Sequence, residues 1–290
     1  MFEIIYRYDP SRPLATSRPG TPVEARTWLE SGNQAFAHLC AQDLEDSSSR
    51  SWLLPLDPRD LGLGGGGQAL AQEPFAAVLG CADARVPLET IFQRGMNDIF
   101  AVRVAGNVLG AECLGSMEYA ARHLHSLKLA VVLGHSGCGA VTATVDAFLA
   151  PADYTQIVAT QSLRAIVDRL FVMVRGAETS LAGAHGDAVV QRPGYRAALI
   201  DVAIALNAMA TASMLQRELG VDHSDLGVAW AVFDLKSRRA GAWLAGANGG
   251  EDELTGLLPP PHGVDETRAM ALRLASSRRI KALLDGQEYS

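Results

Sequence analysis

The chain has 290 residues, 48% of them hydrophobic and 20% charged, which is enough for a sizeable core in one large domain or two small ones. A formal net charge of −7 argues against a general nucleic-acid partner. No apolar run approaches the roughly 20 residues of a membrane-spanning helix, so we expect no association with a membrane. Four cysteines do not make a disulfide scaffold and the amino terminus lacks the pattern of a secretory signal, which together predict a reducing, cytoplasmic location.

The amino-terminal segment, residues 1–42, is expected to hold an arm and one helix. Its first 20 residues are rich in Pro and Arg and predict an extended arm. Thr21 is a good helix cap, Pro22 suits the first helical position and Glu24 stands three residues after the cap, so a helix is predicted to begin here. Residues 43–67 are polar and end in a run of four glycines, which predicts a flexible insertion.

The central segment alternates between strand-like and helix-like patterns. Apolar runs at 75–79, 99–104 and 127–133 are typical of strands, and the stretch 115–123 between the last two is typical of a helix. This alternation predicts an α/β fold with a mostly parallel central sheet flanked by helices.

The second half of the chain predicts more helices and an antiparallel hairpin. The expected elements are helices at 156–182 and 194–219, strands at 226–235 and 241–244, and a last helix near 266–284. We expect a single domain over 1–290, with its core in residues 68–246 and a tail over 247–290.

Chemically reactive side chains follow two of the expected strands. Cys81, Asp83 and Arg85 come just after the first strand, and His135 and Cys138 stand on a glycine-rich turn after the third. Side chains at the carboxyl ends of neighbouring parallel strands converge in space, so one shared site is expected. Two thiols and an imidazole are ligands that zinc prefers, and three protein ligands leave one tetrahedral position open, as in catalytic zinc sites.

Asp83 has two roles open to it. An Asp and an Arg two residues apart can form a bidentate pair, and a carboxylate held in that way orients a neighbouring group without ligating metal. Released from Arg85, Asp83 could ligate the ion instead. The other two cysteines, Cys40 and Cys113, are expected to be small buried hydrophobes.

Four ordered stretches of the chain resemble the β-class carbonic anhydrases. They are Cys81-Ala82-Asp83-Ala84-Arg85-Val86-Pro87, residues 99–107 (IFAVRVAGN), residues 115–120 (GSMEYA), and Gly134-His135-Ser136-Gly137-Cys138-Gly139-Ala140. The likeness runs from Gln72 to Val145 and more loosely from Thr21 to Leu244. Several motifs in order, at compatible spacing, make a chance match improbable.

The resemblance implies a metal centre and a reaction. In the family pattern Cys81, His135 and Cys138 hold Zn²⁺, and Asp83 and Arg85 form the catalytic dyad. As in some members of the family, Asp83 is expected to become a fourth zinc ligand in a closed state if its pairing with Arg85 breaks. The implied reaction is the reversible hydration of carbon dioxide to bicarbonate and a proton, by attack of zinc-bound hydroxide.

The resemblance also implies a substrate pocket and a partner. Gln72 matches a glutamine that hydrogen-bonds substrate or bicarbonate, Phe100 and Tyr119 match the apolar wall for carbon dioxide, and Gly139 matches a position beside the substrate. The family pocket lies at a dimer interface, so a homodimer or a higher even-numbered homo-oligomer is expected.

Three features depart from the family pattern, and two other functions stay open. The family usually has Ser where this chain has Ala84, and often Asn where it has Val104, and the insertion at 43–67 is longer than expected. One alternative is a hydrolase of carbonyl sulfide or carbon disulfide on the same scaffold, because these substrates are also linear and apolar. Another is a paralogue that binds zinc without catalysis.

Overall fold

The computed structural model describes residues 2–7, 18–41, 50–55, 70–154, 160–220, 225–246 and 253–287. Strand β1, Phe2–Arg7, pairs in parallel with β2, Arg50–Pro55, in a two-stranded sheet. β2 lies inside the segment predicted as a flexible insertion, so the prediction of a segment without regular structure is wrong for these six residues. Their apolar run, Trp52-Leu53-Leu54, is typical of a strand. The glycine run at 64–67 lies outside the described residues.

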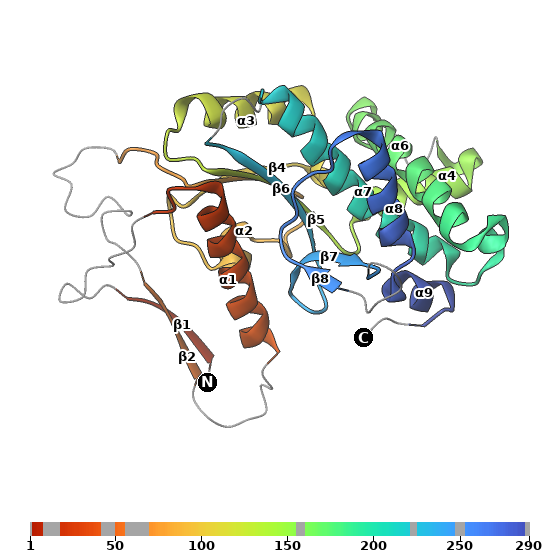
Figure 1. Cartoon of the computed structure of the whole chain (residues 1–290), viewed down its shortest axis with the longest axis horizontal. Helices are drawn as coiled ribbons and strands as arrows, with labels where there is room; N and C mark the ends of the chain where they lie inside the picture. The colour runs from red at the N-terminus through yellow and green to blue at the C-terminus, as the bar shows by residue number, and fades with distance from the viewer. Residues whose placement is uncertain are drawn as a thin grey trace.

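The main sheet has six strands in the order β4-β3-β5-β6-β7-β8, and the first four are parallel (Figure 1). The strands are β3 Ala76–Gly80, β4 Ile99–Arg103, β5 Leu129–His135, β6 Gly227–Phe233, β7 Ala240–Leu244 and β8 Glu253–Thr255. β6 and β7 form the antiparallel hairpin that the sequence predicts, and β8 adds a short further strand. The α/β class and the mostly parallel sheet are confirmed.

Position in the sheet explains the composition of its strands. Every residue of β3 and β5 is buried, and both strands are runs of Ala, Val and Leu with few other residues, as expected for parallel strands covered on both faces. β4 lies at the edge of the sheet and alternates between half-buried and exposed residues.

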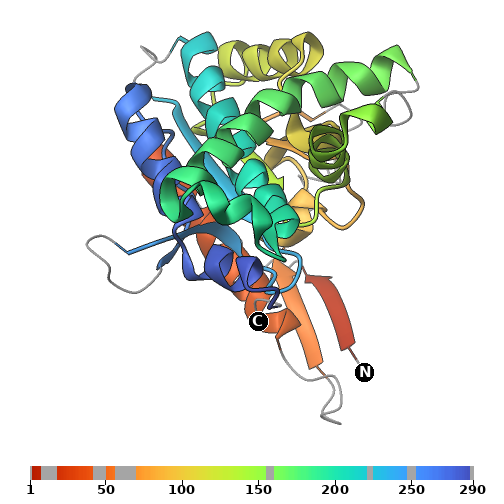
Figure 2. The same cartoon turned by 90° about the vertical axis from the view of Figure 1, so that its right-hand side faces the viewer.

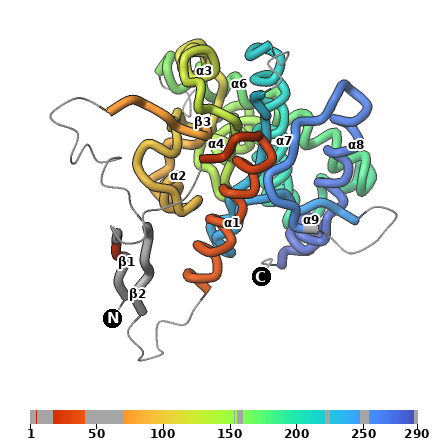
Figure 3. Tube along the Cα trace, turned by 60° about the vertical axis from the view of Figure 1, so that its left-hand side comes forward, coloured from red at the N-terminus to blue at the C-terminus, as the bar shows by residue number. Residues whose placement is uncertain are grey.

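Two helical layers cover the two faces of the sheet. On one face, α1 (Pro22–Cys40) and α2 (Leu88–Phe92) lie side by side (Figures 1 and 3). Leu29 and Phe92 of these helices belong to one core with Val131 of β5. The other face carries α3 (Ala111–His123), α4 (Gly139–Leu149), α6 (Gln161–His185) and α7 (Tyr195–Glu218). There Leu170 and Met209 pack in one core with Val132, the neighbour of Val131 along β5. Alternate residues of one strand therefore serve different cores.

Helix α1 begins where the sequence predicts. The Thr21 hydroxyl accepts the backbone N–H of Glu24 at 3.2 Å. The Glu24 carboxylate accepts the N–H of Gly20 at 2.7 Å, one residue earlier than the reciprocal bond of a capping box. The Glu24 N–H, one of the first-turn donors without a partner inside the helix, is thereby satisfied, which stabilises the start of the helix.

Helix α7 is long and apolar enough to cross a membrane by length and composition, with a mean hydropathy of 1.7 over its most apolar window. That window is 78% buried inside the protein, where α7 packs against β5, β6 and α6. A core helix of this kind passes the same test, so the apolar sequence is explained by its packing.

The tail folds back onto its own chain. The single helix expected near 266–284 is two helices, α8 (Gly263–Ala275) and α9 (Arg278–Leu284), because the chain turns at Ser276 and the Ser277 hydroxyl caps α9. α8 packs against α6 and α7, and α9 packs against α7 (Figure 2). Short 3₁₀ turns in the described part of the chain lie at Ala105–Asn107, Pro151–Asp153 and Asp187–Gln191.

Candidate metal centre

The three predicted ligands meet at the carboxyl edge of the sheet. Cys81 directly follows β3, His135 is the last residue of β5, and Cys138 caps α4. β3 and β5 are neighbouring parallel strands, so their ends lie together. The ligand atoms of the three side chains lie within 4.8 Å of one another and all three residues are buried. The predicted convergence is confirmed.

The imidazole of His135 is held in the tautomer that a metal ligand needs. Its Nδ1 lies 3.0 Å from the backbone oxygen of Ser136, and because a carbonyl can only accept, Nδ1 carries the proton. Nε2 is therefore an acceptor, yet it is buried and has no hydrogen-bond partner among the described residues. A buried nitrogen lone pair without a donor, beside two thiols, fits a metal ion.

The two buried thiols affect each other's ionisation. The pKa of Cys81 lies well below its usual value because the Cys138 thiol donates a hydrogen bond to it, helped by the backbone N–H of Gly106 at 3.3 Å. The pKa of Cys138 is raised by its hydrogen bond to Cys81 and by burial. A divalent cation can displace thiol protons, and a donor set of two sulfurs and one nitrogen suits zinc.

Asp83 is paired with Arg85, as one of its two predicted roles requires. Arg85 Nε donates to Asp83 Oδ1 at 2.9 Å, and Arg85 Nη2 donates to Oδ2 at 2.7 Å. These bonds hold the pKa of Asp83 well below its usual range, so the carboxylate stays ionised. Oδ2 also lies 3.8 Å from His135 Nε2, which places the negative charge beside the ligand cluster. The ligation of metal by Asp83 in a closed state stays a prediction.

Two residues that the sequence analysis did not single out support this site. Arg103, the last residue of β4, donates to the backbone oxygens of Cys81 at 3.0 Å and of Asp83 at 2.6 Å. Asn207 is buried in the apolar helix α7 and donates to the oxygen of Gly106 at 2.8 Å. An amide within the otherwise apolar run at 202–210 was the available signal for Asn207.

The turn at Gly106 needs glycine. Its φ is +66°, and an added Cβ would lie 3.1 Å from the Ala140 side chain and 3.2 Å from that of Leu170. The close approach lets the Gly106 N–H reach the Cys81 sulfur. Local backbone geometry therefore helps to hold a thiolate in the buried cluster.

The predicted substrate residues divide into two groups. Gly139 is the first residue of α4 and follows Cys138, so it lies at the metal centre. Gln72 precedes the amino end of β3, whereas Cys81 follows its carboxyl end, and five strand residues span about 16 Å. The structure therefore does not bring Gln72 to the metal centre of its own chain.

Phe100 and Tyr119 lie together, also away from the end of the sheet that holds the ligands. Phe100 pairs with Ala77, three residues before Gly80, and its ring centroid lies 6.4 Å from that of Tyr119. Tyr119 is 50% exposed on α3. The two rings form an apolar surface at edge strand β4. The sequence analysis predicts that this surface is part of the substrate pocket.

The remaining sequence predictions at this site have mixed outcomes. Cys40 is exposed at the end of α1 and Cys113 is half-buried on α3, so the prediction that both are buried hydrophobes is wrong. The prediction failed because the residue type alone does not show which face of its helix a cysteine occupies. Ala84 is exposed in the turn between Asp83 and Arg85, and Val104 packs against the core.

Known proteins resemble this chain over its central part. The carbonic anhydrase family model matches residues 76–240, more than half of the chain. Carbonic anhydrase 2 of Mycobacterium tuberculosis is 51% identical over 126 residues, which cover 43% of this chain and 54% of that protein. The carbonic anhydrase of Mycolicibacterium smegmatis is 52% identical over 77 residues, covering 27% and 37%. The chain thus spans about half the length, or less, of these curated relatives.

A solved structure described as one of two tetrameric β-carbonic anhydrases from Sordaria macrospora is 21% identical, with a TM-score of 0.47, and the match covers 72% of this chain and 92% of that one. The family match at residues 76–240 includes all three ligands and the Asp83–Arg85 pair. The chain belongs to the β-class carbonic anhydrase family.

Proposed function

We propose that the protein is a zinc-dependent carbonic anhydrase that interconverts carbon dioxide and bicarbonate. The observation that carries the proposal is the buried Cys81–His135–Cys138 cluster, with donor atoms within 4.8 Å of one another, beside a carboxylate held by Arg85. The names of the curated relatives support the same activity. No feature of the described residues favours a sulfur-containing substrate or loss of catalysis.

The metal ligands in this proposal are the two thiolates and His135 Nε2. When bound, zinc acts as a Lewis acid that makes water a nucleophile near neutral pH. The bond from His135 Nδ1 to the Ser136 oxygen keeps Nε2 free to bind and fixes the plane of the ring. The N–H of Gly106 supports the Cys81 thiolate, which limits its loss by protonation.

Asp83 orients the attacking water in this proposal. An ionised carboxylate accepts a hydrogen bond from water and aligns the oxygen with the carbon of the substrate. The new C–O bond forms as one C=O electron pair moves onto oxygen, and a proton leaves to solvent. Arg85 keeps Asp83 ionised, and its hydrogen bonds to the carboxylate also hold Asp83 away from the metal. If the pair separates, Asp83 can take the open metal position and close the site.

A homodimer, or a higher even-numbered oligomer, completes the pocket in this proposal. Gln72 lies at the far end of β3 from Cys81, and Phe100 and Tyr119 form a partly exposed surface at edge strand β4. A second copy of the chain can present that surface to the metal centre of the first. This arrangement accounts for predicted substrate residues that do not reach the site of their own chain. The cytoplasmic location remains a prediction.

Stopped-flow measurement of carbon dioxide hydration tests the proposed function. The purified protein is first assayed for zinc and then measured from about pH 6.5 to 9, since the ionisation of zinc-bound water falls near pH 7 in such enzymes. Turnover that rises with pH, from protein carrying about one zinc per chain, is the expected result. Protein that holds zinc and shows no turnover at any pH would contradict the proposal, and assays with carbonyl sulfide and carbon disulfide would follow.

A further inference from the structure

The backbone that orients His135 is bonded to the loop that follows β6. Ser136 supplies the oxygen that accepts His135 Nδ1–H. The N–H of Ser136 donates to the Phe233 oxygen at 3.0 Å, and the Ser136 hydroxyl accepts the N–H of Leu235 at 2.8 Å. Ser136 is thus held from both sides of Asp234, so the position of the loop sets the position of the oxygen that fixes the imidazole.

Asp234 is the buried charge at the centre of this loop. It is 5% exposed, and its carboxylate accepts the N–H of Ser237 at 3.0 Å and the Ser237 hydroxyl at 2.8 Å. Burial acts to raise the pKa of Asp234, but the Ser237 bonds, the charge of Arg279 and a hydrogen bond with Ser136 together lower it. The carboxylate is therefore ionised, and a buried ionised carboxylate depends on its partners.

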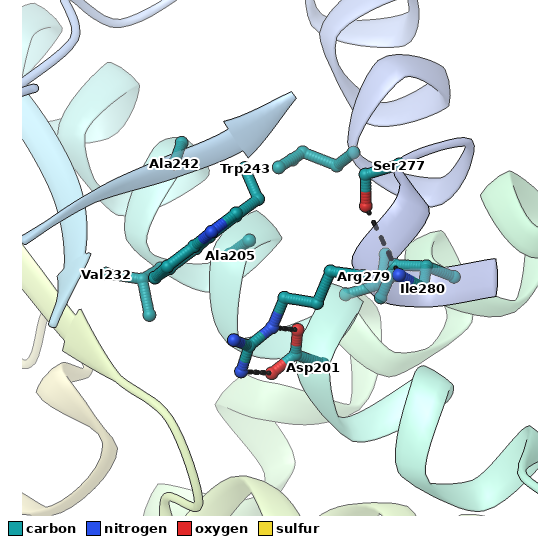
Figure 4. Close-up of a pocket in the computed structure, with 10 residues that line it drawn as sticks. Asp201, Ala205, Val232, Ala242, Trp243, Ser277, Arg279 and Ile280 are labelled. Carbon is teal, nitrogen blue, oxygen red and sulfur yellow. Dashed lines mark hydrogen bonds and ion pairs between the residues drawn. The ribbon is translucent and has the colours of Figure 1, made fainter. Parts of the chain in front are cut away.

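Arg279 supplies the positive charge from the tail helix α9. Its Nη2 lies 3.5 Å from Asp234 Oδ1, and its guanidinium is held by both carboxylate oxygens of Asp201 on α7, at 2.7 and 3.1 Å. The ring of Trp243 stacks 4.7 Å from the guanidinium carbon, so Arg279 lies between Trp243 and Asp201 (Figure 4). The Arg279 side chain is 13% exposed. These contacts hold the guanidinium against Asp201, Asp234 and Trp243.

We propose that Arg279 is a positioning residue for the metal centre: through Asp234 and Ser136 it fixes the orientation of the His135 imidazole. The tail helix is then a working part of the site, although Arg279 lies beyond the residues, 76–240, that match the family. The inference rests on the proposed function, because it concerns the ion that His135 would bind.

The series of contacts from Arg279 through Asp234 and Ser136 to His135 has a specific consequence for metal binding. If Arg279 is removed, Asp234 loses a charged partner in a buried position, and the loop can relax toward solvent to hydrate the carboxylate. Ser136 moves with the loop, and the imidazole loses its fixed plane. Partners one contact removed from a metal ligand typically change metal affinity by about 10- to 100-fold. Arg279 acts through two further residues, so we expect the lower end, about tenfold.

The test measures zinc affinity and ligand geometry separately from activity. Arg279→Met keeps the length and apolar contacts of the side chain and removes its charge. Zinc affinity is measured by competition with a chelator, and the geometry by the visible absorption of the Co²⁺-loaded protein. The matched control is Arg192→Met, which breaks another ion pair of the tail, that of Arg192 with Asp285 just after α9. We expect R279M to bind zinc about tenfold more weakly with an altered cobalt spectrum, and R192M to match the wild type.

A purely structural role predicts a different result. In that case R279M lowers the melting temperature while the folded protein keeps wild-type zinc affinity and a wild-type cobalt spectrum, which would overturn the proposal. Asp234→Asn provides a second route if R279M does not fold, since it removes the charge that Arg279 faces. We expect the same loss from D234N, and in the double variant a loss smaller than the sum, because both act through one chain of contacts. Unchanged zinc affinity in D234N would also overturn it.

The outcomes also separate this inference from the proposed function. Wild-type protein that binds no zinc, or binds it equally well without Cys138, contradicts the metal centre itself. Wild-type protein that binds zinc through Cys138, with R279M and D234N unaltered, contradicts only the role of Arg279.

Discussion

Arg85 holds Asp83 by both carboxylate oxygens, at 2.9 and 2.7 Å, while one of those oxygens lies 3.8 Å from His135 Nε2. The same carboxylate therefore faces a fixed cation on one side and the metal ligands on the other. The proposed role of Asp83 in orienting water rests on this position between Arg85 and the ligand cluster.

Replacing Asp83 by Asn should separate metal binding from turnover. Asp83→Asn keeps the size of the side chain but removes the charge that accepts a hydrogen bond from water and aligns it, so we expect zinc content to stay at about one per chain and turnover to fall about 100-fold or more. Zinc analysis and stopped-flow hydration check this. Asp168→Asn, on the exposed surface of α6, is the control and should leave both unchanged. Full turnover in D83N would contradict the role given to Asp83.

Removing one buried thiol should release the metal. Cys138→Ala leaves one thiolate and one imidazole, and two ligands do not hold a zinc ion firmly. We expect zinc content to fall far below one per chain after dialysis, measured by elemental analysis. Cys113→Ala is the matched control, because Cys113 lies outside the cluster and should leave zinc content unchanged. Full occupancy in C138A would show that the ligand set is wrong.

Mixing two impaired variants should restore activity if the pocket is shared. In a mixed dimer of Asp83→Asn and Gln72→Ala chains, the intact metal centre of the Q72A chain meets the intact Gln72 of the D83N chain. We expect co-expressed, co-purified chains to exceed the turnover of either variant alone. Activity that equals the average of the two would argue that each chain uses its own Gln72, which its distance along β3 makes hard to achieve.

The ion pair between Asp146 on α4 and Arg196 on α7 should weaken in acid. Its bonds of 2.6 and 2.9 Å lower the pKa of Asp146, so the folded pKa lies below the unfolded value. The pair therefore contributes stability above the unfolded pKa, about 3.9, and loses it as pH falls through the folded pKa. Because both groups are largely exposed, Arg196→Met should cost less than about 1 kcal/mol at pH 7, and less still near pH 3, measured by urea unfolding. A larger loss of unfolding free energy at pH 3 than at pH 7 would contradict the predicted direction.

Two helical glycines should respond in opposite directions to alanine. In α1, a Cβ at Gly32 would lie 1.8 Å from the backbone oxygen of Phe92 in α2, so Gly32→Ala must separate the two helices. We expect a cost of about 1–3 kcal/mol in unfolding free energy. At Gly115 in α3 an added Cβ meets nothing within 4 Å, and Gly115→Ala should stabilise by about 0.5–1 kcal/mol. Denaturant unfolding of both variants checks the contrast, and equal effects would count against it.

Most of the parallel sheet was predictable because its strands are uniform apolar runs. β3, β4 and β5 lie within one or two residues of the predicted ranges, and the hairpin of β6 and β7 was also predicted. The elements that were missed are short or locally ambiguous. α2 has five residues and β8 three, too few to show a period, and α4 begins inside the glycine-rich turn that holds Cys138.

The sequence by itself predicted that Cys81, His135 and Cys138 would lie together and that Asp83 could pair with Arg85, and the structure shows both relationships. Each of these residues follows the end of a strand that its own apolar residues specify, and the ends of parallel strands converge whatever their separation along the chain. Only the tertiary structure decided that Gln72 lies away from Cys81, that Arg103 and Asn207 support the site, and that Arg279 reaches Asp234 from the tail. These relationships depend on contacts between residues distant in sequence, and local propensity carries no information about which helix a surface will pack against.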